Sequence, residues 1–124
     1  MDEALTLFIR GTIRSVWALE TLLLTRKDPS RTWTSESLAR ELRGNAGLAQ
    51  DVLATLESAG LLAASDAGYA YAPASPRLEA LSAELEQTYR LRPVAVVNAI
   101  VASRNDPLAS FADAFRLKGE PKKP

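Results

Sequence analysis

Charged side chains are distributed unevenly along this chain of 124 residues. Residues 26–43 hold five basic and three acidic residues, whereas residues 44–72 hold three acidic residues and no basic one. Arginine and lysine are the side chains that neutralise phosphate groups. The basic residues of the first segment, which could do this chemistry, are Arg26, Lys27, Arg31, Arg40 and Arg43.

Catalytic chemistry is poorly represented in the composition. The chain has no cysteine and no histidine. Disulfides and thiolate zinc sites are therefore excluded, and the commonest general base is missing. The six glycines are scattered and form no phosphate-binding loop. Carboxylate pairs such as Glu84/Glu86 are typical of exposed helix surfaces. We therefore expect no enzyme, no metal site and no cofactor.

The N-terminal sequence MDEALTLF is acidic and lacks the basic region of a secretory signal. The longest apolar stretch, PVAVVNAIVA at residues 93–102, is much shorter than the roughly 20 residues that a membrane span needs. We therefore expect no membrane association and a cytoplasmic location.

Apolar residues recur at helical spacing through residues 3–25 and predict one long N-terminal helix. Its apolar arc covers roughly half of the circumference, which is more than one small domain usually buries. A second copy of the chain would cover the remainder, so we expect a homodimer. The candidate interface residues are Ile9, Ile13, Val16 and Trp17, together with Phe111 and Phe115 of a short last helix.

Two short helices are predicted in the middle of the chain. Thr34 occupies the N-cap position of a helix over 35–43, and Gly44 would end that helix as its C′ residue. Asn45 is the N-cap candidate of a second helix over 46–59. A tight turn is therefore expected between the two helices.

A short extended piece is predicted at 31–34, before these helices, and a β-hairpin at 61–73 after them. Gly68 suits a positive φ in the hairpin turn. Pro76 and Pro93 are each predicted at the first position of a C-terminal helix. The helix from Pro93 is apolar nearly all round, which predicts that it is buried.

The order of these elements is that of a winged helix-turn-helix. Residues 30–72 resemble bacterial winged-helix regulators such as the MarR-like group. The resemblance rests on Thr34, on Leu38-Ala39 with Leu42, on the turn Gly44-Asn45, on Ala49, Leu53 and Leu56, and on ESAGLL before the wing. It implies a mainly α (α+β) fold with a long N-terminal helix, a small hairpin wing and additional C-terminal helices. The expected single domain covers 1–117, with the helix-turn-helix at about 34–60, the wing at about 61–72, C-terminal helices at about 76–117 and a disordered tail at 118–124.

The resemblance also implies a homodimeric transcriptional regulator whose second motif helix enters the major groove of duplex DNA. Carried over by position, the residues that face the groove are Ala46, Gly47, Leu48, Gln50, Asp51, Ala54 and Thr55. The polar side chains of Gln50 and Thr55, together with Asn45 just before this helix, could hydrogen-bond to base edges. The five basic residues of 26–43 could contact phosphates, because the first motif helix crosses the DNA backbone.

The chain departs from this family in its charges. Relatives commonly carry basic residues near the positions of Asp51 and Thr55 and at the wing tip, where this chain has Asp66. A surface without cations gains nothing from the release of counterions. The alternative is a winged helix that has lost DNA affinity and binds a protein through its acidic 46–55 surface. That surface would use Ala46, Leu48, Asp51 and Asp66, and Arg40 and Arg43 would be solvated charges paired with Glu36, Glu41 or Asp51.

Overall fold

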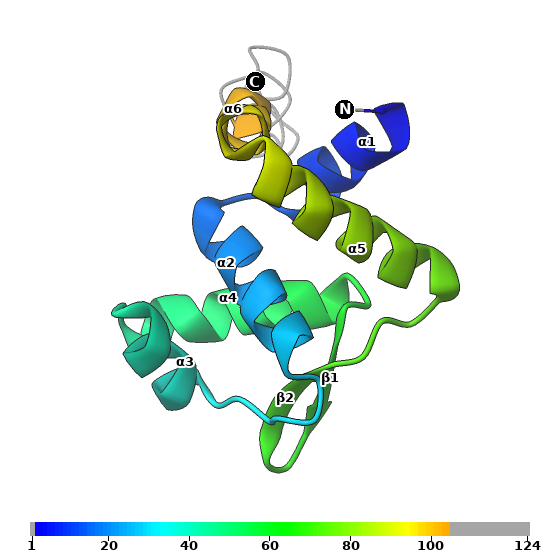
Figure 1. The fold of residues 1–124 in the computed structure, drawn as a ribbon. Helices are drawn as coiled ribbons and strands as arrows, with labels where there is room; N and C mark the ends of the chain where they lie inside the picture. The colour runs from blue at the N-terminus through cyan, green and yellow to red at the C-terminus, as the bar shows by residue number, and fades with distance from the viewer. Residues whose placement is uncertain (1, 105–124) are drawn as a thin grey trace, which may run out of the picture.

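The computed structural model describes residues 2–104, which form six helices and one antiparallel hairpin. In chain order these are α1 (Glu3–Thr12), α2 (Val16–Lys27), α3 (Ser35–Leu42), α4 (Ala46–Ser58), β1 (Leu62–Ser65), β2 (Gly68–Tyr71), α5 (Pro76–Leu91) and α6 (Pro93–Arg104). Helix α2 lies between two groups of elements, with α1, α5 and α6 at one end and α3, α4 and the hairpin at the other (Figure 1). No helix within the described residues is both long and apolar enough for a membrane span.

The N-terminal region forms two helices, so the prediction of one long helix over 3–25 is wrong. Helix α1 ends at Thr12, and Ser15 is the N-cap of α2. The Ser15 hydroxyl accepts a hydrogen bond from the Ala18 N–H at 3.0 Å. A serine side chain can replace the hydrogen bonds of a continuous helix in this way, which explains the break. The apolar spacing continues across the break because both helices bury a face in the same core. The broad apolar arc is therefore two separate faces.

The two helices predicted in the middle of the chain are confirmed as α3 and α4, together with their N-caps. The Thr34 hydroxyl accepts from the Ser37 N–H at 3.0 Å, and the Ser37 hydroxyl accepts from the Thr34 N–H at 2.9 Å. The Asn45 carboxamide oxygen accepts from the Leu48 N–H at 2.7 Å. These bonds satisfy N–H groups that have no partner inside the helix, which fixes where each helix begins.

The turn between α3 and α4 differs from the prediction in one respect. The left-handed residue after α3 is Arg43, with φ of 60°, and not Gly44. Gly44 is needed for a different reason, since a Cβ on it would lie 2.0 Å from Cη2 of Trp17. The indole of Trp17 therefore packs directly on the backbone of this turn and joins α2 to it.

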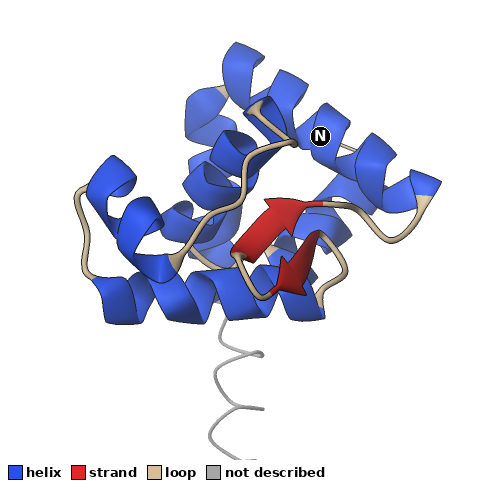
Figure 2. Cartoon of the chain, turned by 90° about the horizontal axis from the view of Figure 1, so that it is seen from below, coloured by secondary structure: helices blue, strands red, loops and turns tan. Residues whose placement is uncertain are grey.

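The predicted hairpin is confirmed, with Ser65 paired to Gly68 across a turn of two residues. The extended piece also forms, because Trp33 and Tyr69 exchange two backbone hydrogen bonds of 2.7 and 2.8 Å. Gly68 has φ of 137°, and a Cβ on it would lie 2.3 Å from the carbonyl oxygen of Trp33. Strand β1 packs against α4, so the hairpin is held beside that helix (Figure 2).

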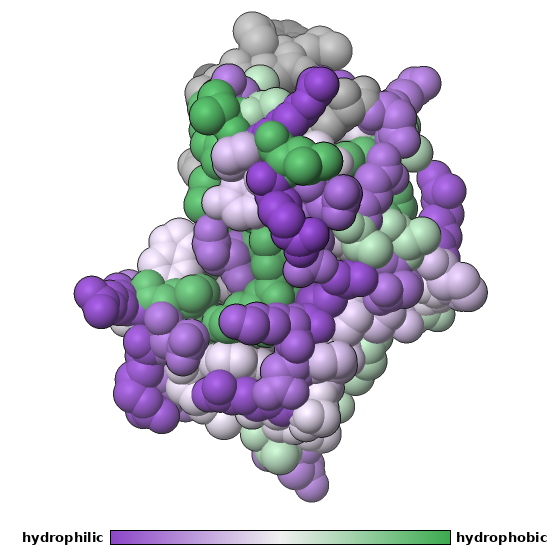
Figure 3. Space-filling model, in the orientation of Figure 1, coloured by the Kyte–Doolittle hydropathy of each residue, from purple (hydrophilic) through white to green (hydrophobic). Residues whose placement is uncertain are grey.

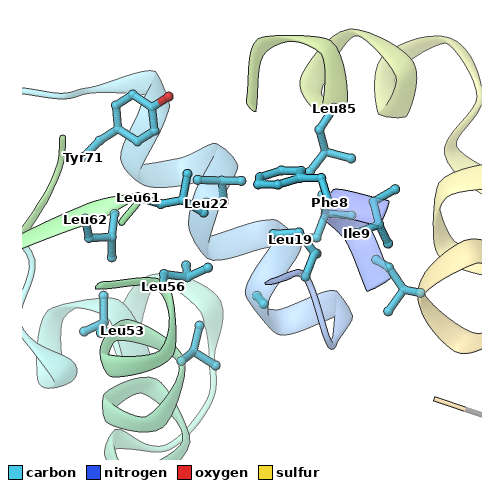
Figure 4. Packing of buried hydrophobic residues seen from close by; sticks show 14 of the residues in the cluster. Phe8, Ile9, Leu19, Leu22, Leu53, Leu56, Leu61, Leu62, Tyr71 and Leu85 are labelled. Atoms are coloured by element: carbon cyan, nitrogen blue, oxygen red, sulfur yellow. The ribbon is translucent and has the colours of Figure 1, made fainter. Parts of the chain in front are cut away.

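Helix α2 is at the centre of the core. Its side chains Leu19 and Leu22 are fully buried. Figure 4 shows Leu53, Leu56, Leu61, Leu62 and Tyr71 on one side of α2, and Phe8, Ile9 and Leu85 on the other. One continuous apolar cluster thus connects the hairpin end of the molecule to the α1, α5 and α6 end.

Helix α6 is only half buried, which differs from the prediction that it is a buried helix. Val96 and Ile100 are buried, whereas Val94 is 69% exposed and Val101 44% exposed. The helix packs on α1 and α5 at the end of the molecule, and within the described residues these two helices cover one side of it. Figure 3 shows apolar side chains gathered near this end.

Candidate nucleic-acid interface

Arg26, the first of the predicted phosphate contacts, lies inside an ion-pair network between α2 and α5. Its guanidinium contacts Glu79 at 3.0 Å and also pairs with Glu86. The Tyr71 hydroxyl donates to the second Glu79 oxygen at 2.6 Å, and the guanidinium lies near the Tyr71 ring. The Arg26 side chain is only 19% exposed. Arg26 therefore connects α2 to α5, and its guanidinium is not available to phosphate.

The electrostatics of this network keep Glu79 ionised. The hydrogen bond from Tyr71, together with that from Arg26, lowers the pKa of Glu79. Burial, followed by the hydrogen bond to Glu79, raises the pKa of Tyr71, which stays a donor. Sequence reasoning missed this network. Its one local signal is the spacing of Glu79 and Glu86, which are seven residues apart and therefore on one face of α5.

The other four predicted phosphate contacts, Lys27, Arg31, Arg40 and Arg43, are exposed. Within residues 2–104 none of the four forms an ion pair, so the expected pairing of Arg40 and Arg43 with nearby carboxylates is not found. Arg31 stacks on Trp33, with its Cζ 3.6 Å from the centre of the ring. This contact orients Arg31 beside the isolated bridge that joins Trp33 to Tyr69 of β2.

Helix α4 buries one apolar face and exposes the opposite face. Ala49, Val52, Leu53 and Leu56 are buried, and Leu48 is partly buried. The exposed residues are Ala46, Gly47, Gln50, Asp51, Thr55, Glu57 and Ser58. The exposed face of α4 therefore combines small and polar side chains with two carboxylates, and it carries no cation of its own.

The polar residues of α4 diverge to two sides of the helix. The Gln50 amide donates to the Tyr69 hydroxyl at 3.0 Å, which links α4 to the hairpin. Asp51 and Thr55 instead line a shallow recess together with Arg14 of the segment before α2. Arg14 thus brings a cation to the edge of α4. Sequence reasoning missed it, because nothing local relates two residues that are 37 positions apart.

The side-chain amide of Asn45, a predicted base contact, also caps α4. Its oxygen is engaged by the Leu48 N–H as the cap of α4. The NH₂ group can still donate outward, since the residue is exposed. Asp66, which was predicted at the tip of a wing, is also exposed, in the turn of the hairpin.

The predicted dimer residues do not form one surface. Ile9 and Ile13 are fully buried in the core of the chain itself, so their assignment to a dimer interface is wrong. Val16 is 39% exposed and Trp17 is partly exposed, and both line a recess between α2 and α3. Phe111 and Phe115 lie outside the described residues.

The described structure therefore links the α2–α3 connection to α4 through a series of side-chain and backbone contacts. Arg31 stacks on Trp33, Trp33 pairs with Tyr69, and Tyr69 accepts from Gln50. Arg40 and Arg43 precede α4 on the chain, and Arg14 lies at its edge. No family model, curated protein or solved structure matches this chain, so the interpretation of this surface rests on its own residues.

Proposed function

We propose that α2 to β2 form a winged helix-turn-helix unit and that the protein binds duplex DNA as a homodimer in transcriptional control. The observation that carries this proposal is the exposure of α4 between α3 and the hairpin, next to cations that form no ion pair within residues 2–104. The major groove of B-DNA admits one α-helix. In this arrangement α4 is the helix that enters the groove, and the hairpin contacts the neighbouring backbone.

Phosphate contacts come from residues around α4, because α4 itself has no cation. Arg40 and Arg43 reach the backbone from α3 and its turn, Lys27 from the end of α2, and Arg31 from the α2–α3 connection. Arg14 lines the same recess as Asp51 at the edge of α4 and adds a further cation there. Fewer cations than usual predict modest affinity and a shallow dependence on salt.

Base contacts are few in this proposal. Gln50 and Thr55 present an amide and a hydroxyl on the exposed face of α4, and Asn45 presents its NH₂ group. Gln50 would exchange its hydrogen bond with Tyr69 for one with a base edge. Because so few side chains contact bases, most of the binding free energy would come from phosphate contacts and would not depend on the DNA sequence.

The test is the binding of random duplex DNA over a range of salt concentrations. Changing Arg40 and Arg43 together to alanine should weaken binding to every sequence. The slope of log K against log salt should flatten by roughly two, about one for each lost phosphate contact. Arg77→Ala is the matched control, since Arg77 is an exposed arginine of α5 outside the proposed interface. It should leave both affinity and slope unchanged.

Asp51→Arg should have the opposite effect, because it replaces a repelled carboxylate on α4 with a cation. Binding to random duplex should strengthen and its salt dependence should steepen by roughly one. If the wild type does not bind duplex at low salt and Asp51→Arg creates no binding, DNA is not the ligand.

A second candidate function is favoured by the charge of α4 and the wing. Asp51, Glu57 and Asp66 are all exposed, and residues 44–72 contain no basic side chain. Such a surface suits a protein partner that has a basic patch. Asp51→Arg would then reduce partner capture, and the Arg40 and Arg43 changes would leave it intact. This outcome, in pull-down experiments from native extract, separates the two functions.

The homodimer is proposed through the apolar residues that the described fold leaves uncovered. Leu7, Leu91, Val94 and Val101 are 58, 68, 69 and 44% exposed, and α6 packs against both α1 and α5. Val94 and Val101 are seven residues apart, and therefore on one face of α6. A second copy would remove this apolar surface from water.

Sedimentation at micromolar concentration should therefore show a dimer. Val94→Glu should raise the dissociation constant of the dimer at least about tenfold, because the substitution would bury a charge at the interface. Val16→Glu is the control, since Val16 is an exposed valine at the start of α2, where it lines the recess beside α3. A wild type that sediments as a monomer would contradict the proposal, and dissociation by Val16→Glu alone would move the interface to α2.

A further inference from the structure

A recess of about 320 Å³ lies between α2 and the end of α3 and is separate from the exposed face of α4. It is lined by Val16, Trp17, Glu20, Glu41, Leu42 and Arg43. On the face shown in Figure 3, apolar side chains lie recessed between hydrophilic ones at the level of α2 and α3. The volume is at the lower end of the range for small-molecule sites, which combine apolar walls with a few polar groups.

The aromatic wall of this recess is held in place before any ligand arrives. The six-membered ring of Trp17 packs on the backbone of the α3–α4 turn at Gly44. A Cβ at this position would lie 2.0 Å from the ring, so the packing depends on a glycine there. The ring is partly exposed, so its remaining surface is available to a ligand. An indole can bind another aromatic ring and can also attract a cation to its face.

The charges around the recess favour a cation. Glu20 and Glu41 supply two carboxylates against the single guanidinium of Arg43, and no ion pair joins these three groups in the described part of the chain. Helix α3 ends at Leu42, so the partial negative charge of its C-terminus points toward the same place. A monovalent positive group would therefore complement the recess.

Glu20 is held on this surface by a contact from another helix. The Tyr89 hydroxyl of α5 donates to one of its carboxylate oxygens at 3.2 Å. Burial and the charge of Glu20 raise the pKa of Tyr89, so the phenol stays protonated as a donor. Glu20 interrupts the apolar side chains of α2, where a buried core face would have no carboxylate. Its position at the recess accounts for a charged residue at this point of the helix.

We propose that this recess binds a small aromatic amine in its protonated form. Its ring packs on Trp17 and the Val16 and Leu42 side chains, and its ammonium group lies toward the Glu20 and Glu41 carboxylates. This site shares Arg43 with the proposed DNA interface, but its ligand is recognised by α2 and the end of α3 and needs no residue of α4.

The probe is 2-naphthylmethylammonium, compared with the neutral 2-naphthalenemethanol and the anionic 2-naphthoate. Binding is followed by the indole N–H resonance of Trp17 in an NMR titration, and Trp33, which is 1% exposed, is the internal reference. The amine should bind with a dissociation constant on the order of 1 mM or lower. The alcohol should bind several-fold more weakly and the naphthoate weakest.

Charge variants test the recognition without disturbing the fold. Glu41→Gln should weaken binding of the amine about 2–5-fold, and Arg43→Gln should strengthen it by a similar factor, because the two changes have opposite effects on the charge of the rim. Glu57→Gln is the matched control, since Glu57 is an exposed glutamate of α4 that does not line the recess. Trp17→Leu should weaken binding at least about fivefold.

Equal binding of amine and naphthoate would overturn the proposal, as would a titration that shifts Trp33 and leaves Trp17 unchanged. If Trp17→Leu does not fold, the Glu41 and Arg43 variants still decide the matter, since both residues are exposed. A third result also contradicts it. Probe affinity that falls as protein concentration rises, with a sedimentation change in Glu41→Gln, would show that a second copy fills the recess.

Discussion

Leu53→Ala should lower the free energy of unfolding by about 2–5 kcal/mol, the range for a buried leucine that is truncated to alanine. Leu53 is fully buried and lies in the part of the core where α4 meets α2 and the hairpin (Figure 4). The loss combines the transfer of the removed methyl groups with the cavity they leave. Urea denaturation followed by circular dichroism measures it.

The control is Thr55→Ala, a truncation at an exposed position of the same helix. Surface substitutions of this kind usually change stability by less than about 0.5 kcal/mol. A loss below about 1 kcal/mol for Leu53→Ala would mean that α4 is not seated on α2 as described. That result would also remove the basis for treating the opposite face of α4 as the exposed one.

Arg26→Ala should lower the free energy of unfolding by about 2–4 kcal/mol. Removing one member of a buried ion pair usually costs about 3–5 kcal/mol, and partial access of solvent to Glu79 and Glu86 reduces that value. The change also leaves Glu79 without its cation, and Glu86 keeps only the exposed Arg90 as a partner. Arg90→Ala is the matched control, because Arg90 pairs with the same Glu86 at 3.6 Å but its side chain is 65% exposed. It should cost less than about 1 kcal/mol.

The same network predicts how stability depends on pH. The pKa of Glu79 is lower in the folded protein than in an unfolded chain. Its contribution is therefore fully present above the unfolded value, near pH 4.3, and is lost as the pH falls through the lower folded value. Arg26→Ala should flatten this acid limb, because one of the two groups that stabilise the charged form is gone. An unchanged limb in the variant would contradict the role given to Arg26.

Much of the local structure was determined by the sequence alone. Thr34 and Asn45 begin α3 and α4, since a polar side chain at the N-cap bonds to an N–H only three residues along the chain. Pro76 and Pro93 begin α5 and α6, and Gly68 takes its positive φ in the hairpin. Short-range hydrogen bonds and backbone sterics act within a few residues, so they can be seen in a short stretch of sequence.

The charges around the candidate interface were decided by the tertiary structure. Arg26 has the same side chain as Arg40, yet Arg26 is enclosed because α5 brings Glu79 and Glu86 to it from 53 and 60 residues away. Arg14 reaches the edge of α4 only because α2 crosses that helix. The burial of α6 was likewise decided by the tertiary structure, because α1 and α5 cover one side of it within the described residues. An ion pair or a covered face depends on which distant segments meet, and the spacing of residues along the chain does not contain that information.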